Sequence, residues 1–218
     1  MSVSEKHRFN MLERAAVYRA ISERRDMRHF INASIDEDVL LRLLTAFHQA
    51  PSVGLMQPWR IIRITEKTLR TEIQALVEEE RLNTAEALGE RQQDFMRLKV
   101  EGIADCAELL VVSLMAEREQ HIFGRRTLPE MDLASVACAI QNMWLAARAE
   151  GLGMGWVSLF EPQKLATLLS IPDGAKPIAI LCLGHVDKFY TLPMLEQENW
   201  RQGQSLDELL YENVWGDA

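Results

Sequence analysis

Residues 131–156, MDLASVACAIQNMWLAARAEGLGMGW, decide the fold of this chain. The first twenty carry apolar side chains almost all round one predicted helix, which indicates a helix that is buried on most faces. Gly151, Gly153 and Gly155 then end the helix and open the segment 156–160. Because a chain of 218 residues has little core to cover such a helix, we expect a second subunit to help bury it.

Regular elements are predicted on both sides of this stretch. Some segments space their apolar residues as a helix does, one alternates in polarity as a strand does, and two are the short apolar runs typical of central strands. Together they predict one domain that spans residues 1–218. The predicted helices are 12–23, 36–50 and 162–169, and the predicted strands are 60–64, 109–115 and 177–186.

Two segments carry too little core pattern to belong to the centre of the domain. Residues 66–102 are helical in pattern but strongly charged, and we expect them to form a lid, with an inert surface helix as the alternative. The tail, residues 196–218, carries scattered large apolar residues from Trp200 to Trp215. We expect this tail to dock on the partner subunit as an exchanged arm.

Charge and composition exclude several classes of function. The formal net charge of −8 argues against a nucleic-acid partner, because phosphate backbones bind basic surfaces. The apolar runs are too short to cross a membrane, and the first residues lack the pattern of a signal peptide, so we expect a cytoplasmic protein.

The cysteines and histidines do not predict a metal site. Cys106, Cys138 and Cys182 are widely separated among apolar neighbours, which is typical of buried reduced thiols. The five histidines never fall at the spacing of metal ligands. We therefore expect no metal.

A cluster of charged residues follows the first long helix. Arg24 and Arg28 lie four apart, so at a helix end they would share a face and could bind a phosphate, although simple complementation of the helix dipole explains them as well. Asp26 lies between the arginines, either as a charge balance or as a proton-transfer group beside a ligand. The glycines at 151, 153 and 155 are either a helix stop or a place where the backbone approaches a planar ligand, with Ser158 nearby.

Several ordered motifs resemble the flavin-binding pattern of the nitroreductase superfamily. They are RRDMR at 24–28, APS at 50–52, QPW at 57–59 and GLG at 151–153 followed by Trp156. The resemblance implies an α+β, three-layer, nitroreductase-like fold with a central mixed sheet flanked by helices. It also implies a homodimer with flavin mononucleotide (FMN) sites at its interface and a C-terminal arm exchanged between subunits.

A closer resemblance, over nearly the whole chain, is to the branch of 5,6-dimethylbenzimidazole synthases. It rests on ERAAVYRAI at 13–21, HQAPSVG at 48–54, WLAARAEG at 144–151, GWVS at 155–158 and GHVD at 184–187. Asp26 stands where many nitroreductases have serine, and Leu55 where many have an asparagine that contacts the flavin ring. Both differences disfavour an ordinary hydride-shuttling reductase.

The function implied by this resemblance is the oxygen-dependent fragmentation of reduced FMN. The products would be the lower-ligand base of vitamin B12, for cobalamin biosynthesis, and erythrose 4-phosphate. Reduced FMN and O2 would be substrates, and NAD(P)H would act only through a separate flavin reductase. The implied catalytic residues are Asp26 and Ser158, and the implied flavin-binding residues are Arg24, Arg25, Asp26, Met27, Arg28, Ser52, Gly54, Met56, Gln57, Leu98, Gly151, Ser158 and Arg201.

Two other functions remain open at this point. In an NAD(P)H-dependent flavin reductase or nitroreductase, the flavin would be a recycled cofactor that nicotinamide must reach. In a flavin-binding protein without turnover, the arginines would bind phosphate and Asp26 would be only their ion-pair partner.

Overall fold

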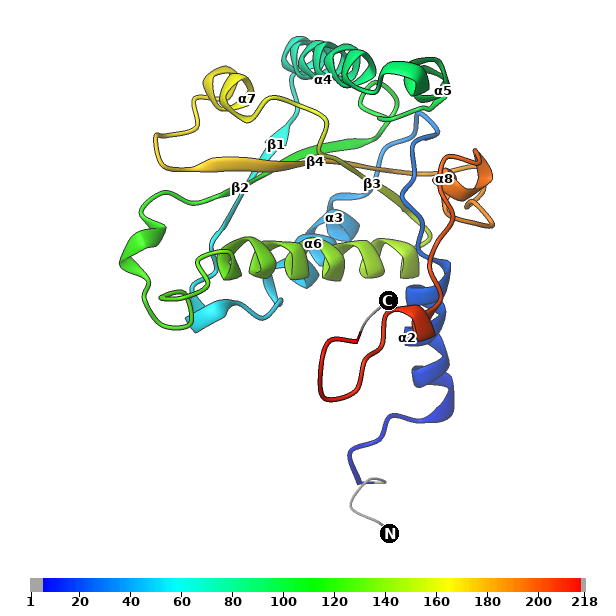
Figure 1. Ribbon diagram of the computed structural model, residues 1–218, viewed down its shortest axis with the longest axis vertical. Coiled ribbons are helices and arrows are strands. Elements are labelled where there is room, and N and C mark those ends of the chain that lie inside the picture. The colour runs from blue at the N-terminus through cyan, green and yellow to red at the C-terminus, as the bar shows by residue number, and fades with distance from the viewer. Residues whose placement is uncertain (1–5, 217–218) are drawn as a thin grey trace.

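The computed structural model of the chain describes residues 6–216 and has a four-stranded sheet between two layers of helices (Figure 1). The sheet order is β1-β2-β4-β3, so the two continuous apolar runs form its centre, as the sequence predicts. All three strand pairs are antiparallel, and the expected mixed pairing is reduced to an isolated parallel bridge between Asp26 and Met154. The strands are β1 (Trp59–Ile64), β2 (Glu108–Leu114), β3 (Gly153–Val157) and β4 (Lys176–Gly184).

One face of the sheet is covered by α3 (Glu37–His48) and α6 (Met131–Ala149). Leu40, Leu43 and Phe47 recur at helical spacing in α3 and are buried against the α6 side of the core. In α6 eight of the 19 residues are buried, among them Val136, Ile140, Met143 and Trp144, so a single chain covers one side of this helix and not most of its faces. Leu133, which was expected to be buried, lies on the uncovered side and is exposed.

The other face is covered by α4 (Lys67–Ala87) and α7 (Pro162–Leu168). Ile73 and Val77 of α4 are buried in one cluster with the residues of β2 and β4 that point towards α4 and away from α6. The first half of the segment expected to be a lid is therefore a packed layer of the domain. Its second half, from the end of α4 through α5 (Gln92–Arg97), lines the cavity that also contains Asp26.

The remaining elements connect these layers or extend from them. Helix α2 (Met11–Glu23) begins with a capping box between Asn10 and Glu13 and buries none of its residues. The short elements are η1 (Val53–Leu55), η2 (Gly89–Arg91), η3 (Arg118–Gln120), α8 (Met194–Gln197) and η4 (Leu206–Glu208).

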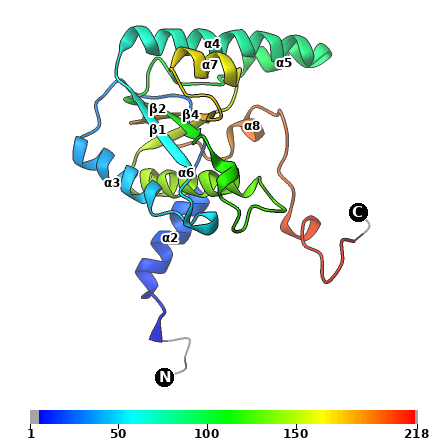
Figure 2. The ribbon, with the colours of Figure 1, turned by 90° about the vertical axis from the view of Figure 1, so that its left-hand side faces the viewer.

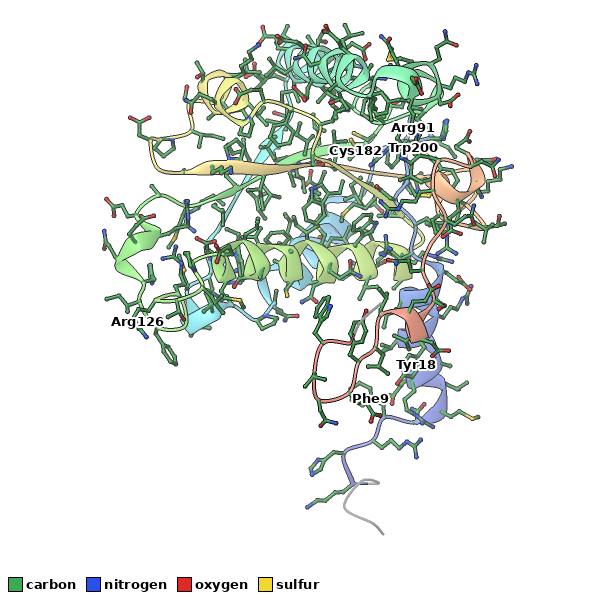
Figure 3. All side chains as sticks on the ribbon, viewed as in Figure 1. Phe9, Tyr18, Arg91, Arg126, Cys182 and Trp200 are labelled. Carbon is green, nitrogen blue, oxygen red and sulfur yellow. The ribbon has the colours of Figure 1, made fainter. Side chains whose placement is uncertain are left out.

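Two parts of the chain stand away from the three layers. Figure 2 shows α2 projecting from one end and the tail after α8 extending separately from the body. Their large apolar side chains are uncovered, among them Phe9 and Tyr18 (Figure 3) and, in the tail, Trp215, which is 87% exposed. A single copy of the chain thus leaves apolar surface at two places where a partner could bury it.

Two local expectations differ from the structure. Cys106 and Cys182 are buried as predicted, but Cys138 is exposed, because it lies on the side of α6 turned away from the sheet. The third strand begins at Gly153 and not after the glycines. Within residues 6–216, no helix is long and apolar enough to cross a membrane.

Candidate functional site

Two cavities meet at the sheet edge formed by β3. One has a volume of about 330 Å³ and lies between β3 and the segment 84–100, and the other has a volume of about 490 Å³ and lies beside α6. Asp26, Trp156 and Ser158 line both. The two candidate catalytic residues are therefore brought together, although 132 positions separate them in the sequence.

An extended segment positions Asp26 at this junction. Helix α2 ends at Glu23, and Arg24 already has an extended backbone with ψ of 134°. The N–H of Met27 then donates to the carbonyl of Met154 in β3 at 3.0 Å. The segment thus extends the sheet locally beyond its edge strand.

The sequence placed Arg24 and Arg28 on one face of a helix end, and the extended backbone shows that this was wrong. Arg24 and Arg28 do not share a helix face, because the helix has ended before them. In an extended chain alternate side chains point the same way, so Arg24, Asp26 and Arg28 share one side while Met27 points into the core, where it is fully buried.

Gly155 makes this close approach possible. A Cβ atom at residue 155 would lie 2.2 Å from the carbonyl oxygen of Met27 and 2.5 Å from a guanidinium nitrogen of Arg28. The glycine run therefore lets the backbone of β3 approach another strand of the same chain and the Arg28 side chain. Gly151 has a different role, because with φ of 79° it ends α6, and it lines neither cavity.

Asp26 is held by two hydrogen bonds that reach both of its carboxylate oxygens. A guanidinium nitrogen of Arg28 donates to Oδ2 at 2.6 Å, and the N–H of Trp156 donates to Oδ1 at 2.9 Å. Burial raises the pKa of Asp26 above its ordinary value, although both donors favour the charged form. The side chain is still 43% exposed in the single chain, so the carboxyl is fixed in orientation and accessible from the cavities.

The three arginines have separate tasks. Arg28 is buried and also donates to the carbonyl of Trp156 at 2.8 Å. Arg25 donates to the carbonyl of Ser22 at 2.8 Å and to that of Thr191 at 2.9 Å. It thereby joins the end of α2 to the segment before α8. The Arg24 guanidinium lies 4.5 Å from the ring centroid of Trp144, and burial lowers its pKa. Of the three, Arg24 is the one whose hydrogen-bonding groups are least engaged in the described part of the chain.

The larger of these two cavities extends along α6. Leu133 and Trp144 both line it and are eleven residues apart, which puts them on one helix face about 16 Å from each other. Ser158 follows β3 directly and is exposed to this space. Lys176, at the start of β4, adds a cation that the sequence analysis did not identify.

The loop expected to line the flavin lies on another side of α6. Its Val53 N–H donates to the hydroxyl of Ser135 at 3.0 Å. Ser135 is two residues from Leu133 and therefore about 200° around the helix from the cavity. Ser52, Gly54, Met56 and Gln57 accordingly line neither cavity beside Asp26.

The loop 52–57 has a defined backbone conformation. Gly54, Leu55 and Gln57 all have positive φ, of 53°, 53° and 47°. The hydroxyl of Ser52 accepts the N–H of Gln57 at 3.0 Å, which closes the loop on itself. Leu55 is exposed at its tip.

The other expected site residues are divided between the site and its surroundings. Leu98 is buried and lines the smaller cavity, opposite Asp26. Arg201 follows Trp200, which lines that cavity, but Arg201 itself lines neither of the two. Met27 contributes its backbone to the sheet edge and its side chain to the core.

Trp200 completes the smaller cavity, and Tyr190 supports Arg28 beside it; neither was predicted as a site residue. The Trp200 ring packs on Phe95, and the guanidinium of Arg91 lies 3.5 Å from its centroid (Figure 3). The Tyr190 hydroxyl accepts the N–H of Arg28 at 3.2 Å. Neither contact has a local sequence signal, because each joins segments about a hundred or more residues apart. Within residues 6–216, no three His, Cys, Asp or Glu side chains are grouped as a metal site requires.

Comparisons with known proteins agree with this architecture. Residues 21–185 match the model of the nitroreductase family. The 5,6-dimethylbenzimidazole synthase of Rhodospirillum rubrum is 41% identical over 182 residues, which cover 82% of this chain and 85% of that protein. A 5,6-dimethylbenzimidazole synthase of Rhodobacter capsulatus is 36% identical over 89% of this chain and 95% of its own length.

A solved structure supports the fold independently. Iodotyrosine deiodinase bound to FMN and 3-iodo-L-tyrosine superposes with a TM-score of 0.71 at 19% identity, over 91% of this chain and all of the other. This likeness shows a shared nitroreductase-like fold.

Proposed function

The chain belongs to the nitroreductase family and, within it, to the family of 5,6-dimethylbenzimidazole synthases, and on this premise we propose that it converts reduced FMN and O2 into 5,6-dimethylbenzimidazole and erythrose 4-phosphate. This base is the lower ligand of cobalamin, so the proposed reaction belongs to cobalamin biosynthesis. The observation that carries the proposal is the fixed Asp26 carboxylate, which meets Ser158 at the junction of two cavities.

The length and the aromatic lining of the cavities, and the arginines near them, support a flavin nucleotide as the ligand. The space along α6 extends over about 16 Å, and the Trp144 and Trp156 rings beside it lie 6.5 Å apart and offer aromatic surface to a flat ligand. The Nε atoms of Arg25 and Arg28 are buried without a hydrogen-bond partner in the described chain. An anionic ligand would stabilise this cationic end.

We assign the phosphate end of FMN to Arg24, Arg25 and Arg28, with Arg201 as an additional cation from the tail. Reduced FMN supplies the electrons for reduction of O2 and the carbon atoms of the products. A separate flavin reductase would provide it, with NAD(P)H as the ultimate electron source. Leu98 and Trp200 would exclude water from the ligand on the smaller-cavity side.

Asp26 is the proposed proton-transfer group. A carboxyl with a raised pKa exchanges protons near neutral pH more effectively than an ordinary one. The hydrogen bonds from Arg28 and Trp156 fix its direction, so the carboxylate can accept a proton from a ribityl hydroxyl and return it. Ser158, on the same wall, would orient or relay a proton near the reacting ring.

The site also requires a second copy of the chain. The loop 52–57 lies on the opposite side of α6 from the cavity, so a flavin beside Asp26 could meet this loop only from another subunit. The exposed apolar residues of α2 and of the tail provide surface for such a homodimer. We propose that each flavin lies between the Asp26 wall of one subunit and the loop 52–57 of its partner.

Product analysis tests the proposed reaction. Purified protein is mixed with reduced FMN and O2, and dimethylbenzimidazole, erythrose 4-phosphate and remaining FMN are measured by mass spectrometry. The proposal predicts base formed in proportion to FMN lost. Intact oxidised FMN would contradict it, and rapid reduction of bound flavin by NAD(P)H would favour a flavin reductase or nitroreductase. Flavin binding without turnover would favour a carrier.

A further inference from the structure

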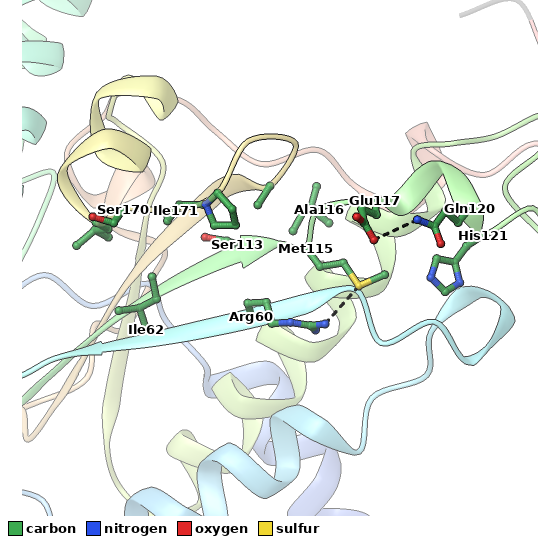
Figure 4. A pocket seen from close by; sticks show the side chains of 14 residues that line it. Arg60, Ile62, Ser113, Met115, Ala116, Glu117, Gln120, His121, Ser170 and Ile171 are labelled. Atoms are coloured by element: carbon green, nitrogen blue, oxygen red, sulfur yellow. Dashed lines mark hydrogen bonds between the residues drawn. The ribbon is translucent and has the colours of Figure 1, made fainter.

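A third cavity lies beside β1 and β2, at the opposite edge of the sheet from β3 and the proposed flavin site. Its volume is about 500 Å³, within the range of small-molecule pockets, and none of its lining residues lines the two cavities beside Asp26. Figure 4 shows its side chains, which come from β1, from β2 and the loop after it, and from the segment that follows α7. Much of the wall is apolar, including Ile62, Leu114 and Ile171.

The cavity contains a buried hydroxyl without a partner. Ser113 is only 2% exposed and lines the cavity, yet its Oγ has no hydrogen-bond partner in the described chain. The residue lies at a bulge, where the pairing of β2 with β4 shifts and Ser113 faces Pro177. An unpaired buried hydroxyl is destabilising, and a ligand that accepts its hydrogen bond would remove that cost.

Arg60 is the residue opposite Ser113 on the neighbouring strand. Arg60 of β1 pairs in register with Ser113, so both side chains are on the same face of the sheet. One terminal nitrogen of Arg60 donates to the carbonyl of Trp59 at 2.7 Å, whereas the other meets only the sulfur of Met115 at 3.6 Å. Sulfur is a weak acceptor, so Arg60 retains capacity for an anion.

The walls of the cavity are held in place without a ligand. The Arg118 side chain donates to the carbonyls of Met115 and of Gly174, the latter at 2.8 Å, and thereby joins the end of β2 to the turn before β4. Asp132 of α6 is buried and accepts from Arg118 at 2.9 Å and from Arg125 at 3.0 Å. This buried ion network fixes the loop that carries His121 and the mouth of the cavity.

We propose that this cavity binds a small organic monoanion with an apolar body, such as an aromatic carboxylate. The carboxylate would pair with Arg60, the body would lie against the apolar wall, and a shift of the side chains that cover the Ser113 Oγ would let the carboxylate accept its hydrogen bond. Glu117 is the acidic residue on the lining, and its carboxylate accepts from Gln120 at 3.1 Å. Its negative charge disfavours a dianion such as a phosphate ester, which separates this ligand class from FMN.

Calorimetric titration of the full-length protein with 2-naphthoate and its neutral counterpart 2-naphthamide tests the proposal. We expect 2-naphthoate to bind more tightly than the amide, equally with and without saturating FMN. Arg60→Gln should weaken 2-naphthoate binding about tenfold or more and abolish the preference for the acid. Ser113→Ala should weaken it several-fold without loss of stability, because it removes an unpaired buried group.

Lys67→Gln is the matched control for a lost cation, since Lys67 lies beyond the other end of β1, and it should leave binding unchanged. Thermal melting of each variant separates lost binding from lost folding. The proposal is overturned if 2-naphthoate does not bind at millimolar concentration, if acid and amide bind equally, or if neither cavity variant weakens binding. Displacement of 2-naphthoate by FMN would also overturn it, because the probe would then occupy the flavin site.

Discussion

The segment 24–28 and the loop 52–57 carry most of the expected flavin contacts, but they are built in different ways. The first is fixed by pairing with β3 and by hydrogen bonds to Asp26 within one chain. The second is fixed by its own turn and by Ser135, on another side of α6. One wall of the proposed site is therefore complete in a single chain, whereas the other depends on assembly. Substitutions at the two places should fail in different ways.

The largest effect is expected for Asp26→Asn. The amide keeps the shape of the side chain but cannot accept a proton, so formation of dimethylbenzimidazole should fall about 10²- to 10⁴-fold while FMN still binds. Single-turnover product analysis and quenching of flavin fluorescence measure the two quantities. Asp36→Asn, at the start of α3, is the control, because that side chain makes no capping hydrogen bond. Unchanged product formation in Asp26→Asn would refute the assigned role.

Gly155→Ala should disrupt the same wall through its backbone. The added Cβ would lie 2.2 Å from the Met27 carbonyl oxygen, so the segment 24–28 must move away from β3. We expect the free energy of unfolding to fall by about 1–3 kcal/mol, as at other overpacked sites, and the affinity for FMN to fall as well. Chemical denaturation and fluorescence titration measure these changes. Gly203→Ala is the control. Its added Cβ would meet only the end of the Glu196 side chain, so neither the free energy of unfolding nor the affinity for FMN should change.

The pH dependence of turnover separates the roles of Arg28 and Asp26. Asp26 must be ionised to accept a proton, so the rate should fall as the solution is acidified through its pKa. Because burial raises that pKa, this fall should begin at a higher pH than it would for an ordinary carboxyl. Arg28 lowers that pKa, and Arg28→Gln should therefore shift the acidic limb to still higher pH, with a smaller shift for Arg28→Lys. An acidic limb that stays in place in Arg28→Gln would show that Asp26 does not control it.

A smaller effect is expected where the tail meets α5. The Arg91 guanidinium covers Trp200 and also donates to its carbonyl at 3.0 Å, which holds one wall of the smaller cavity. Arg91→Gln should admit water and raise the hydrogen peroxide formed per dimethylbenzimidazole a few-fold. Arg97→Gln alters an exposed ion pair in the adjoining helix α5 and should leave this ratio unchanged. Equal ratios in both variants would argue against a closing role for this contact.

The fold was predictable where the periodicity of the sequence matched the packing. The buried face of α3 and the two central strands follow directly from apolar spacing. The helical reading of 24–28 was wrong, because spacing four apart does not tell a helix end from an extended strand that aligns every second residue. Trp200 and Lys176 reach their cavities through tertiary contacts, which leave no local pattern. The position of the loop 52–57 relative to Asp26 follows from the packing of α6 and could not be read from motif order.

The most direct test of the composite site is subunit complementation. Asp26→Asn and a variant of the partner loop, such as Gln57→Trp, are each prepared as inactive homodimers, then unfolded together in equal amounts and refolded. If each site combines Asp26 of one subunit with the loop 52–57 of its partner, half of the dimers are mixed and one of their two sites is intact. The account predicts recovery of about a quarter of the wild-type rate of dimethylbenzimidazole formation. Failure of mixed dimers, verified by differently tagged subunits, to recover any activity would show that both walls of the site come from one chain.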